Sequence, residues 1–462
     1  MIIQNAWHLT LDARGGKVVD AIREVGEELW DWSRNVLGDL EKRIKRAKKD
    51  LEECRRKAIN SQSAAREEIL RYKLEKLEGQ RELYWRQRTQ AHWLKHGDKN
   101  TKFFHGFASE RRRRNRIKKL VREDGVVVEE GAEMRNLITN FYKDLFHSCA
   151  GTRYDELMMH IQPKVSQEMN LFLMKDFSDD EIREALDNMG DLKAPGADGM
   201  PALFYKQFWD IVGADIIKEV KNFLRGGDMP DGWNDTVVVL IPKVPHPERL
   251  KDLRPISLCN VIYKIASKVL SNRLKVILPE IISMNQSAFV PGRLITDNVL
   301  LAYELTHYVQ TKRGGGNCFA AVKLDMSEAY DRVEWIFLEK MMYKLGFDEQ
   351  WVKIIMKCVS TVKYRIKVNG VLTDVITPER GLRQGDPLSP YLFLLCAEAF
   401  SCLLHAAEAS GELMGIKICQ NAPSINHLLF ADDSLLLLKV DERSANHLQH
   451  VLSLYEDCSG KP

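Results

Sequence analysis

Two apolar runs separated by an acidic pair form the most informative stretch of the chain. Residues 428–438 read Leu-Leu-Phe-Ala-Asp-Asp-Ser-Leu-Leu-Leu-Leu, so Asp432 and Asp433 stand between the runs. Each run has the length of a strand, and the acidic pair falls where a tight turn would reverse the chain. The pattern therefore predicts a β-hairpin that holds both carboxylates at its tip.

A second apolar run, further upstream, also ends in a carboxylate. Residues 319–325 read Phe-Ala-Ala-Val-Lys-Leu-Asp. They predict a strand that ends at Asp325, with a helix beginning within residues 326–333. This strand and the hairpin of Asp432 and Asp433 can face each other on one sheet. Three carboxylates there could hold divalent cations, and their oxygens suit magnesium. The alternative is an exposed turn without a ligand.

A glycine- and proline-rich loop lies between the two acidic segments. Residues 380–390 read Arg-Gly-Leu-Arg-Gln-Gly-Asp-Pro-Leu-Ser-Pro and open onto a long apolar stretch, residues 391–407. Glycine lets a backbone approach a ligand closely, so this loop is a candidate ligand contact. The apolar stretch contains Glu398 and is short for a membrane span. We predict that it is a buried helix and that the protein has no membrane partner.

The first ninety or so residues carry the pattern of charged helices. The pattern predicts a helical hairpin or a short coiled coil, and self-association through its seam is the alternative. Apolar residues recur three and four apart along this seam: Leu37, Leu40, Ile44, Ala47, Leu51, Cys54 and Ala58.

Aromatic residues interleaved with cations follow, from Trp85 to Lys119. Rings that stack on bases and cations that meet phosphates fit single-stranded nucleic acid. The alternative is a solvated basic helix face. The cations of this candidate surface are Arg111, Arg112, Arg113, Arg114, Arg116, Lys118 and Lys119.

Two more cations flank strand patterns in the middle of the chain. Residues 237–242 predict a strand that Pro242 stops, with Lys243 directly after it and Arg254 a little further on. Both cations could reach one polyphosphate. Ordinary surface charge is the alternative.

Composition limits the classes of protein that fit. A chain of 462 residues with 45% apolar residues is long enough for a sizeable core. Its net charge is +3, so a nucleic-acid surface must be a local patch. Nine cysteines without a Cys-x-x-Cys pair argue against a structural zinc site and a disulfide framework. No secretory pattern stands at the N-terminus, and we predict an intracellular protein, nuclear or cytoplasmic.

Taken in order, these segments resemble the reverse transcriptases of non-long-terminal-repeat retrotransposons, the LINE type. Each motif alone is modest, but the ordered set is highly specific. Residues 91–105 also resemble the region before the polymerase in plant elements. The resemblance rests on the strand ending at Asp325, residues 380–390 and Phe-Ala-Asp-Asp at 430–433, and extends to Lys-Ala-Pro-Gly-Ala-Asp-Gly at 193–199, Ile-Pro-Lys at 241–243 and Arg-Pro-Ile-Ser-Leu at 254–258.

The resemblance implies an α+β fold with polymerase fingers and palm, the palm being an antiparallel sheet with helices. We expect a helical, basic extension in residues 1–120, the fingers in 121–318 and the palm in 319–462, with part of the fingers between about 350 and 380. The implied activity is RNA-directed DNA synthesis. Its implied partners are an RNA template, a DNA primer and deoxynucleoside triphosphates.

The resemblance also assigns roles to single residues. Asp325, Asp432 and Asp433 match the catalytic, metal-binding triad, which takes two Mg²⁺ ions, or Mn²⁺ as a substitute. Tyr330 stands where the family places an aromatic steric gate against a ribose 2′-hydroxyl; many LINE-type members carry phenylalanine there.

The remaining matches concern the nucleotide and the template. Gln384 matches the loop that packs under the incoming nucleotide. Lys243 and Arg254 match residues that meet its triphosphate. Residues 285–293 match a segment near the template.

The chain departs from the family in two respects. No endonuclease-like segment precedes the polymerase motifs, and the sequence ends at Pro462, before the expected thumb and the family's proton-donating lysine. We therefore expect a truncated polymerase. The alternative functions are a catalytically weak or inactive nucleic-acid-binding retrotransposon remnant and a helical interaction module.

Overall fold

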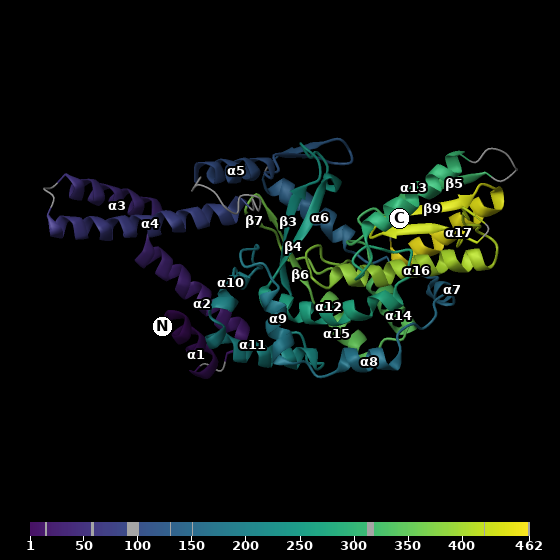
Figure 1. Ribbon diagram of the computed structural model, residues 1–462, viewed down its shortest axis with the longest axis horizontal. Helices are drawn as coiled ribbons and strands as arrows, with labels where there is room; N and C mark the ends of the chain where they lie inside the picture. Colours follow the sequence, from purple (N-terminus) through teal and green to yellow (C-terminus); the bar gives the residue numbers. More distant parts are fainter. Residues whose placement is uncertain are drawn as a thin grey trace. The chain divides into compact units, whose positions relative to one another are not determined.

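The computed structural model consists of two compact units, each built from several stretches of the chain (Figure 1). It describes residues 1–13, 16–56, 60–89, 101–129, 131–149, 151–311, 318–419 and 421–460. The first unit comprises Met1–Gly131, Gly190–Asp215 and Leu240–Arg254, and the second comprises Ala132–Met189, Ile216–Val239 and Pro255–Pro462. The fingers and palm boundaries given above stay predictions.

The first unit is mainly helical at its N-terminal end, as the charge and apolar pattern predicts. Ile44 and Ala47 of α3 pack against Leu77 of α4, so the apolar seam closes a helical hairpin. Ala58 and residues 90–100 lie outside the described residues. The helices are α1 (Ile2–His8), η1 (Leu9–Ala13), α2 (Val18–Trp32), η2 (Ser33–Leu37), α3 (Leu40–Arg55), α4 (Ser61–Thr89), α5 (Thr101–Arg114) and α10 (Ala202–Gln207).

A short hairpin follows α5 in the first unit. β1 (Lys119–Val121) and β2 (Val127–Glu129) pair antiparallel around Gly125, whose φ of +83° suits glycine in a tight turn. The Val121 N–H donates to the Glu248 carbonyl at 2.8 Å. The basic end of α5 is therefore linked to the segment between Lys243 and Arg254 within one unit.

A four-stranded sheet has the order β4-β3-β6-β7. β3 is parallel to β6, and β6 is antiparallel to β7. The strands are β3 (Asp235–Pro242), β4 (Leu253–Cys259), β6 (Lys363–Val368) and β7 (Val371–Leu372), with the turn η3 (Leu250–Asp252) before β4.

Helices of the second unit surround its core. The Ser178 hydroxyl accepts from the Glu181 N–H and the Glu181 carboxylate accepts from the Ser178 N–H, a capping box that starts α9. The helices are α6 (Ala132–Leu145), α7 (Tyr154–Met158), α8 (Gln167–Met174), α9 (Asp179–Asp187), α12 (Val261–Ile281), α13 (Ile295–Thr311), α14 (Trp335–Leu345), α15 (Glu349–Ser360), α16 (Ser389–Ala409) and α17 (Glu442–Ser459); α11 (Trp209–Leu224) crosses the unit boundary.

The helix α16 covers the long apolar stretch that the sequence places inside the protein. Among the described helices it alone is long and apolar enough to cross a membrane, and 72% of its most apolar window is buried inside the protein. Its residues Leu392 to Ala397 are almost entirely covered. Burial of this kind is typical of a core helix, as predicted.

An antiparallel three-stranded sheet with the order β5-β9-β8 lies between α13 and α16 (Figure 1). Its strands are β5 (Phe319–Asp325), β8 (His427–Phe430) and β9 (Asp433–Lys439). Leu428 and Leu437 pack with Leu305 of α13 on one face. On the opposite face His427 lies 3.0 Å from the Ser401 hydroxyl of α16. Both the strand ending at Asp325 and the hairpin are confirmed.

The helix predicted to begin within residues 326–333 does not form there. Residues 327–332 are turns, and α14 begins only at Trp335. The carbonyls of Tyr330 and Val333 accept from the N–H groups of Leu382 and Gly381, at 2.7 and 2.8 Å. Because N–H groups of another loop bond to these carbonyls, the segment forms a turn held by tertiary contacts and not a helix.

Candidate active site

The sheet β5-β9-β8 brings the three predicted aspartates to one end. Asp325 and Asp433 are register partners on neighbouring antiparallel strands. Directly opposed residues point to the same face, with Cβ atoms about 4.5–5.5 Å apart. Asp432 lies in the two-residue turn before Asp433, and Ala431 begins that turn with a φ of +55°. Further along the strands, α13 covers this same face. At the end that carries the aspartates, Asp325 and Asp433 are exposed.

The Lys323 ammonium compensates part of the negative charge of the three aspartates. It precedes Asp325 by two residues and so shares its face of β5. Its Nζ lies 2.9 Å from Asp433 Oδ1, and both side chains are exposed. The hydrogen bond and charge of Asp433, with smaller contributions from Asp325 and Asp432, raise the pKa of the Lys323 ammonium. The Lys323 ammonium is therefore held at the end of the sheet where the three carboxylates lie.

The carboxylate oxygens of this site suit a divalent metal ion, although the three side chains are not arranged around a common metal position. Among the described residues, no group of three or more histidine, cysteine, aspartate and glutamate side chains is arranged to hold a metal ion. Opposed carboxylates repel each other, and here the Lys323 ammonium pairs with one of them. Exposed carboxylate oxygens suit hard cations such as Mg²⁺.

Tyr330 lies beside this carboxylate cluster. Burial raises its phenol pKa, and the negative charge of Asp432 raises it further. The ring stacks on Phe393 of α16, with centroids 4.9 Å apart and planes 11° apart. The ring is thus stacked on α16, within electrostatic reach of Asp432.

The loop that carries Gln384 is held by a buried ionic network. Arg383 pairs with Asp386 at 2.7 Å, and both side chains are almost fully buried. The Tyr263 hydroxyl donates to Asp386, also at 2.7 Å. Gln384 Nε2 donates to the Asp331 carboxylate at 3.1 Å. These contacts fix the loop in the second unit, the unit that holds the aspartates.

Two glycines let this loop pass close to other backbone. Gly381 has a φ of +99°, and a Cβ there would lie 2.7 Å from the Asp331 carbonyl oxygen. Gly385 has a φ of +117°, with the Ser257 carbonyl oxygen at 2.9 Å. A side chain at either position would collide with backbone, which explains the sequence pattern physically.

The other predicted cations lie in the first unit. Lys243 and Arg254 are exposed near the neighbouring ends of β3 and β4, where the Lys243 N–H donates to the Asp252 carbonyl at 2.7 Å. Their assignment to a triphosphate stays a prediction.

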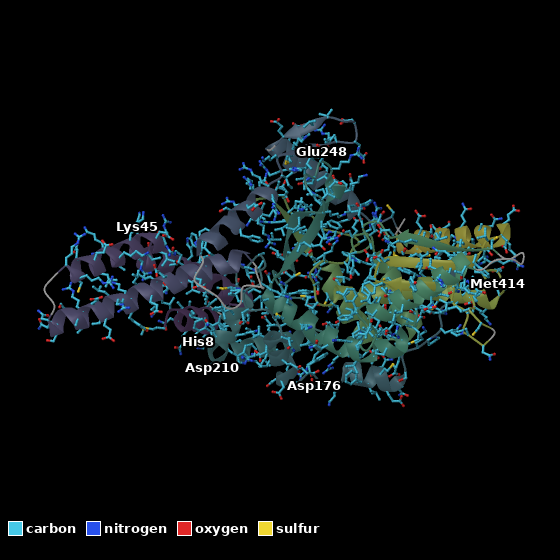
Figure 2. All side chains as sticks on the ribbon, turned by 45° about the horizontal axis from the view of Figure 1, so that its top comes forward. His8, Lys45, Asp176, Asp210, Glu248 and Met414 are labelled. Atoms are coloured by element: carbon cyan, nitrogen blue, oxygen red, sulfur yellow. The ribbon has the colours of Figure 1, made fainter. Side chains whose placement is uncertain are left out.

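The basic residues at the end of α5 are mostly exposed, as a contact surface requires. Arg112, Arg113 and Arg114 are exposed and Arg111 is half-buried. Lys119 Nζ lies 3.0 Å from the Glu248 carboxylate, which Figure 2 labels. Arg116 and Lys118 are also exposed.

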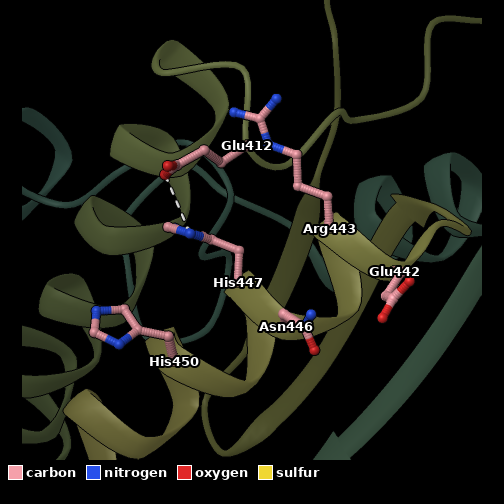
Figure 3. Close-up of a pocket in the computed structure, with 6 residues that line it drawn as sticks. All are labelled: Glu412, Glu442, Arg443, Asn446, His447 and His450. Atoms are coloured by element: carbon pink, nitrogen blue, oxygen red, sulfur yellow. Dashed lines mark ion pairs between the residues drawn. The ribbon is translucent and has the colours of Figure 1, made fainter.

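A separate polar hollow lies along α17 (Figure 3). Its volume is about 560 Å³. His447 Nδ1 lies 3.1 Å from the Glu412 carboxylate across it. None of the residues predicted from the motifs lines it. The lining residues are Glu412, Glu442, Arg443, Asn446, His447 and His450.

Sequence patterns alone do not single out Lys323 or Gln286. The period of two along a strand would have placed Lys323 on the face of Asp325, since the two are separated by one residue. Gln286 lies in residues 285–293, which the resemblance matches to a segment near the template, but nothing in the sequence links it to Ala431, because only the fold brings the two together.

His427, in the strand before the turn, makes stability depend on pH. Burial is the main cause that lowers its pKa to about 3, from an ordinary 6.5. The unfolded chain binds a proton below pH 6.5 and the folded chain does not, so stability falls as pH drops from 6.5 towards 3. We expect a loss of about 1.4 kcal/mol per pH unit.

Urea unfolding between pH 7.5 and 4.5 measures this effect. His427→Gln should reduce the slope between pH 6.5 and 4.5, while His8→Gln, at an exposed position, should leave it in place. An unchanged slope in His427→Gln would assign the pH dependence to other groups.

Comparison with known proteins agrees with this geometry. The sequence profile of the reverse transcriptase (RNA-dependent DNA polymerase) family matches residues 241–460, which include all three aspartates. An uncharacterised 149 kDa protein of transposon TX1 from Xenopus laevis is 32% identical over 358 residues, covering 77% of this chain and 27% of that protein.

Two further relatives extend the comparison. The Pol polyprotein of the type-1 retrotransposable element R2 from Popillia japonica is 28% identical over 249 residues, 53% of this chain and 32% of the polyprotein. An uncharacterised mitochondrial protein of Arabidopsis thaliana is 58% identical over 67 residues, 14% of this chain and 55% of that protein. The chain thus spans 27%, 32% and 55% of these relatives. Residues 241–460 thus match the reverse transcriptase family and are similar to the corresponding part of retrotransposon polyproteins.

Proposed function

We propose that this chain carries out RNA-directed DNA synthesis by nucleotidyl transfer onto a primer 3′-hydroxyl. The observation that carries the proposal is the register pairing of Asp325 with Asp433, with Asp432 in the adjoining turn, inside the matched domain. Reverse transcriptases use divalent metal ions. Here two Mg²⁺ ions held by these carboxylates would polarise the α-phosphate and lower the pKa of the primer hydroxyl.

The other predicted residues would bind and orient the reactants. Asp433 would have to exchange its pairing with Lys323 for a bound metal ion, because the two cations would compete for one carboxylate. Gln384, in a loop anchored by the Arg383–Asp386 pair, supports the incoming nucleotide. Lys243 and Arg254 meet its triphosphate as charge-assisted donors. Positioning of this kind supplies most of the catalysis in phosphoryl transfer.

Primer extension by the purified chain tests the proposal. We expect DNA synthesis on a poly(rA) template with an oligo(dT) primer, dependent on Mg²⁺ or Mn²⁺. Absence of any product with either ion, in protein shown to be folded by circular dichroism, would contradict it. The remaining candidate would then be nucleic-acid binding through the exposed cations at the end of α5.

Tyr330 is the proposed selector of the sugar. Its ring is held against Phe393 and stands near Asp432, so it can exclude a ribose 2′-hydroxyl from the site. Tyr330→Ala should raise ribonucleotide incorporation relative to deoxyribonucleotide incorporation, whereas Tyr330→Phe keeps the ring and should preserve selection. Competition between the two nucleotides in single-addition assays gives the ratio. An equal ratio in wild type and Tyr330→Ala would remove this role.

A further inference from the structure

The turn that carries Asp432 has a backbone conformation that its sequence disfavours. Ala431 has a φ of +55°, in the left-handed region that residues with a Cβ rarely adopt. In a two-residue hairpin turn, a positive φ at the first position normally calls for glycine. Some external contact must therefore favour this conformation.

Gln286 supplies that contact. Its Oε1 accepts from the Ala431 N–H at 3.0 Å, and its Nε2 donates to the Ala431 carbonyl at 3.5 Å. One side-chain amide thus contacts both backbone polar groups of the strained residue. The same Oε1 accepts from the Ala288 N–H at 3.0 Å. Gln286 is 1% exposed, so water cannot replace these bonds freely.

The loop that carries Gln286 is itself fixed along β8. The Leu429 N–H donates to the Asn285 carbonyl at 2.8 Å, and the Ser287 N–H donates to the Leu429 carbonyl at 3.2 Å. Asn298 Nδ2 donates to that same carbonyl at 2.9 Å. The loop thus runs beside β8 as far as the start of the turn at Ala431.

Arg293 closes the loop from the other side. Its guanidinium donates to four backbone carbonyls at 2.6 to 3.0 Å: those of Ser283, Gln286, Pro279 and Ile282. By binding carbonyls both of the loop and of the C-terminal end of α12, Arg293 fixes the position from which Gln286 reaches the turn.

We propose that Gln286 is a positioning residue for the catalytic turn. It holds Ala431 in the left-handed conformation and thereby sets the direction of the Asp432 carboxylate relative to Asp433 and Asp325. A glutamine suits this role because it offers a donor and an acceptor on one planar group. Glutamate would lose the donor and place a further negative charge beside the triad. The inference rests on the proposed function, since it concerns metal binding and catalysis by these carboxylates.

The test compares two buried amides of the same region. Gln286→Met keeps the volume and removes both bonds to the turn. Asn426→Leu is the matched control, because the Asn426 amide is buried and donates to the Leu404 carbonyl at 2.9 Å, away from the turn. We expect Gln286→Met to lower kcat by about 10- to 100-fold with little change in KM for the nucleotide. Asn426→Leu should lose stability but keep kcat.

Two further measurements separate positioning from general damage. Mn²⁺ binding, followed by electron paramagnetic resonance, should weaken in Gln286→Met and remain in Asn426→Leu. Ala431→Gly, introduced into Gln286→Met, should restore much of kcat because glycine adopts a positive φ without help. If Gln286→Met does not fold, Ala431→Val disturbs the same turn with Gln286 in place and should show the same loss of kcat.

The outcomes distinguish this inference from the proposed function. Wild-type protein that neither binds Mn²⁺ through the triad nor extends a primer would contradict the proposed function and this inference with it. Active wild-type protein with equal kcat in Gln286→Met and Asn426→Leu, or without rescue by Ala431→Gly, would overturn the inference alone.

Discussion

Asp432→Asn should lower primer extension by about 10³-fold or more. Metal ions held by carboxylates contribute several kcal/mol to the transition state, and each 1.4 kcal/mol is a factor of about ten in rate. Asparagine keeps the size of the side chain but removes its charge. The turn can then keep its shape, because its contact with Gln286 involves the Ala431 backbone and not the Asp432 side chain.

Asp441→Asn provides a matched control. Asp441 caps α17 by accepting from the Ser444 N–H at 2.8 Å, and asparagine caps helices equally well. This variant should extend primers at the wild-type rate. Extension by Asp432→Asn at more than a tenth of the wild-type rate would exclude Asp432 as a principal metal ligand.

Thermal melts provide a readout that needs no activity. A ligand that binds only the folded state raises its stability, so Mg²⁺ should raise the Tm of the wild type. The double variant Asp325→Ala, Asp432→Ala should lose this shift. An equal shift in both proteins would place the stabilising ion elsewhere.

RNA binding should weaken steeply with salt, and the α5 arginines should account for much of the effect. Each phosphate contact contributes about 0.7 to the log–log slope for a single strand. Replacement of Arg111, Arg112, Arg113 and Arg114 by alanine should therefore flatten the slope by up to about 3. We expect measurable binding at low salt and little at physiological salt. Fluorescence anisotropy with labelled RNA over a salt series measures both.

The helix α3 offers a control of equal charge. Lys45, which Figure 2 labels, lies with other cations on this helix of the same unit. Alanine at Lys42, Arg43, Lys45 and Arg46 removes the same number of charges and should change the slope less. Equal effects of the two replacements would show that net charge, and not the surface at the end of α5, governs binding.

The local pattern of the sequence determined the elements that carry the chemistry. An apolar run that ends in Asp325 and two runs that flank Asp432 and Asp433 became the strand and the hairpin. The apolar stretch after Pro390 became the buried helix α16. These predictions succeed because strand length, turn position and helix burial depend on residues close together in sequence.

Tertiary structure decided how these elements meet. It paired Asp325 with Asp433, set Lys323 against Asp433 and placed the Gln286 amide on Ala431. It also turned residues 327–332 away from the helix that their position suggests, by bonding the Tyr330 carbonyl to Leu382. Such contacts join residues far apart in the chain. No local period encodes them, because their hydrogen bonds and charge pairs form only when the packed core has brought the segments together.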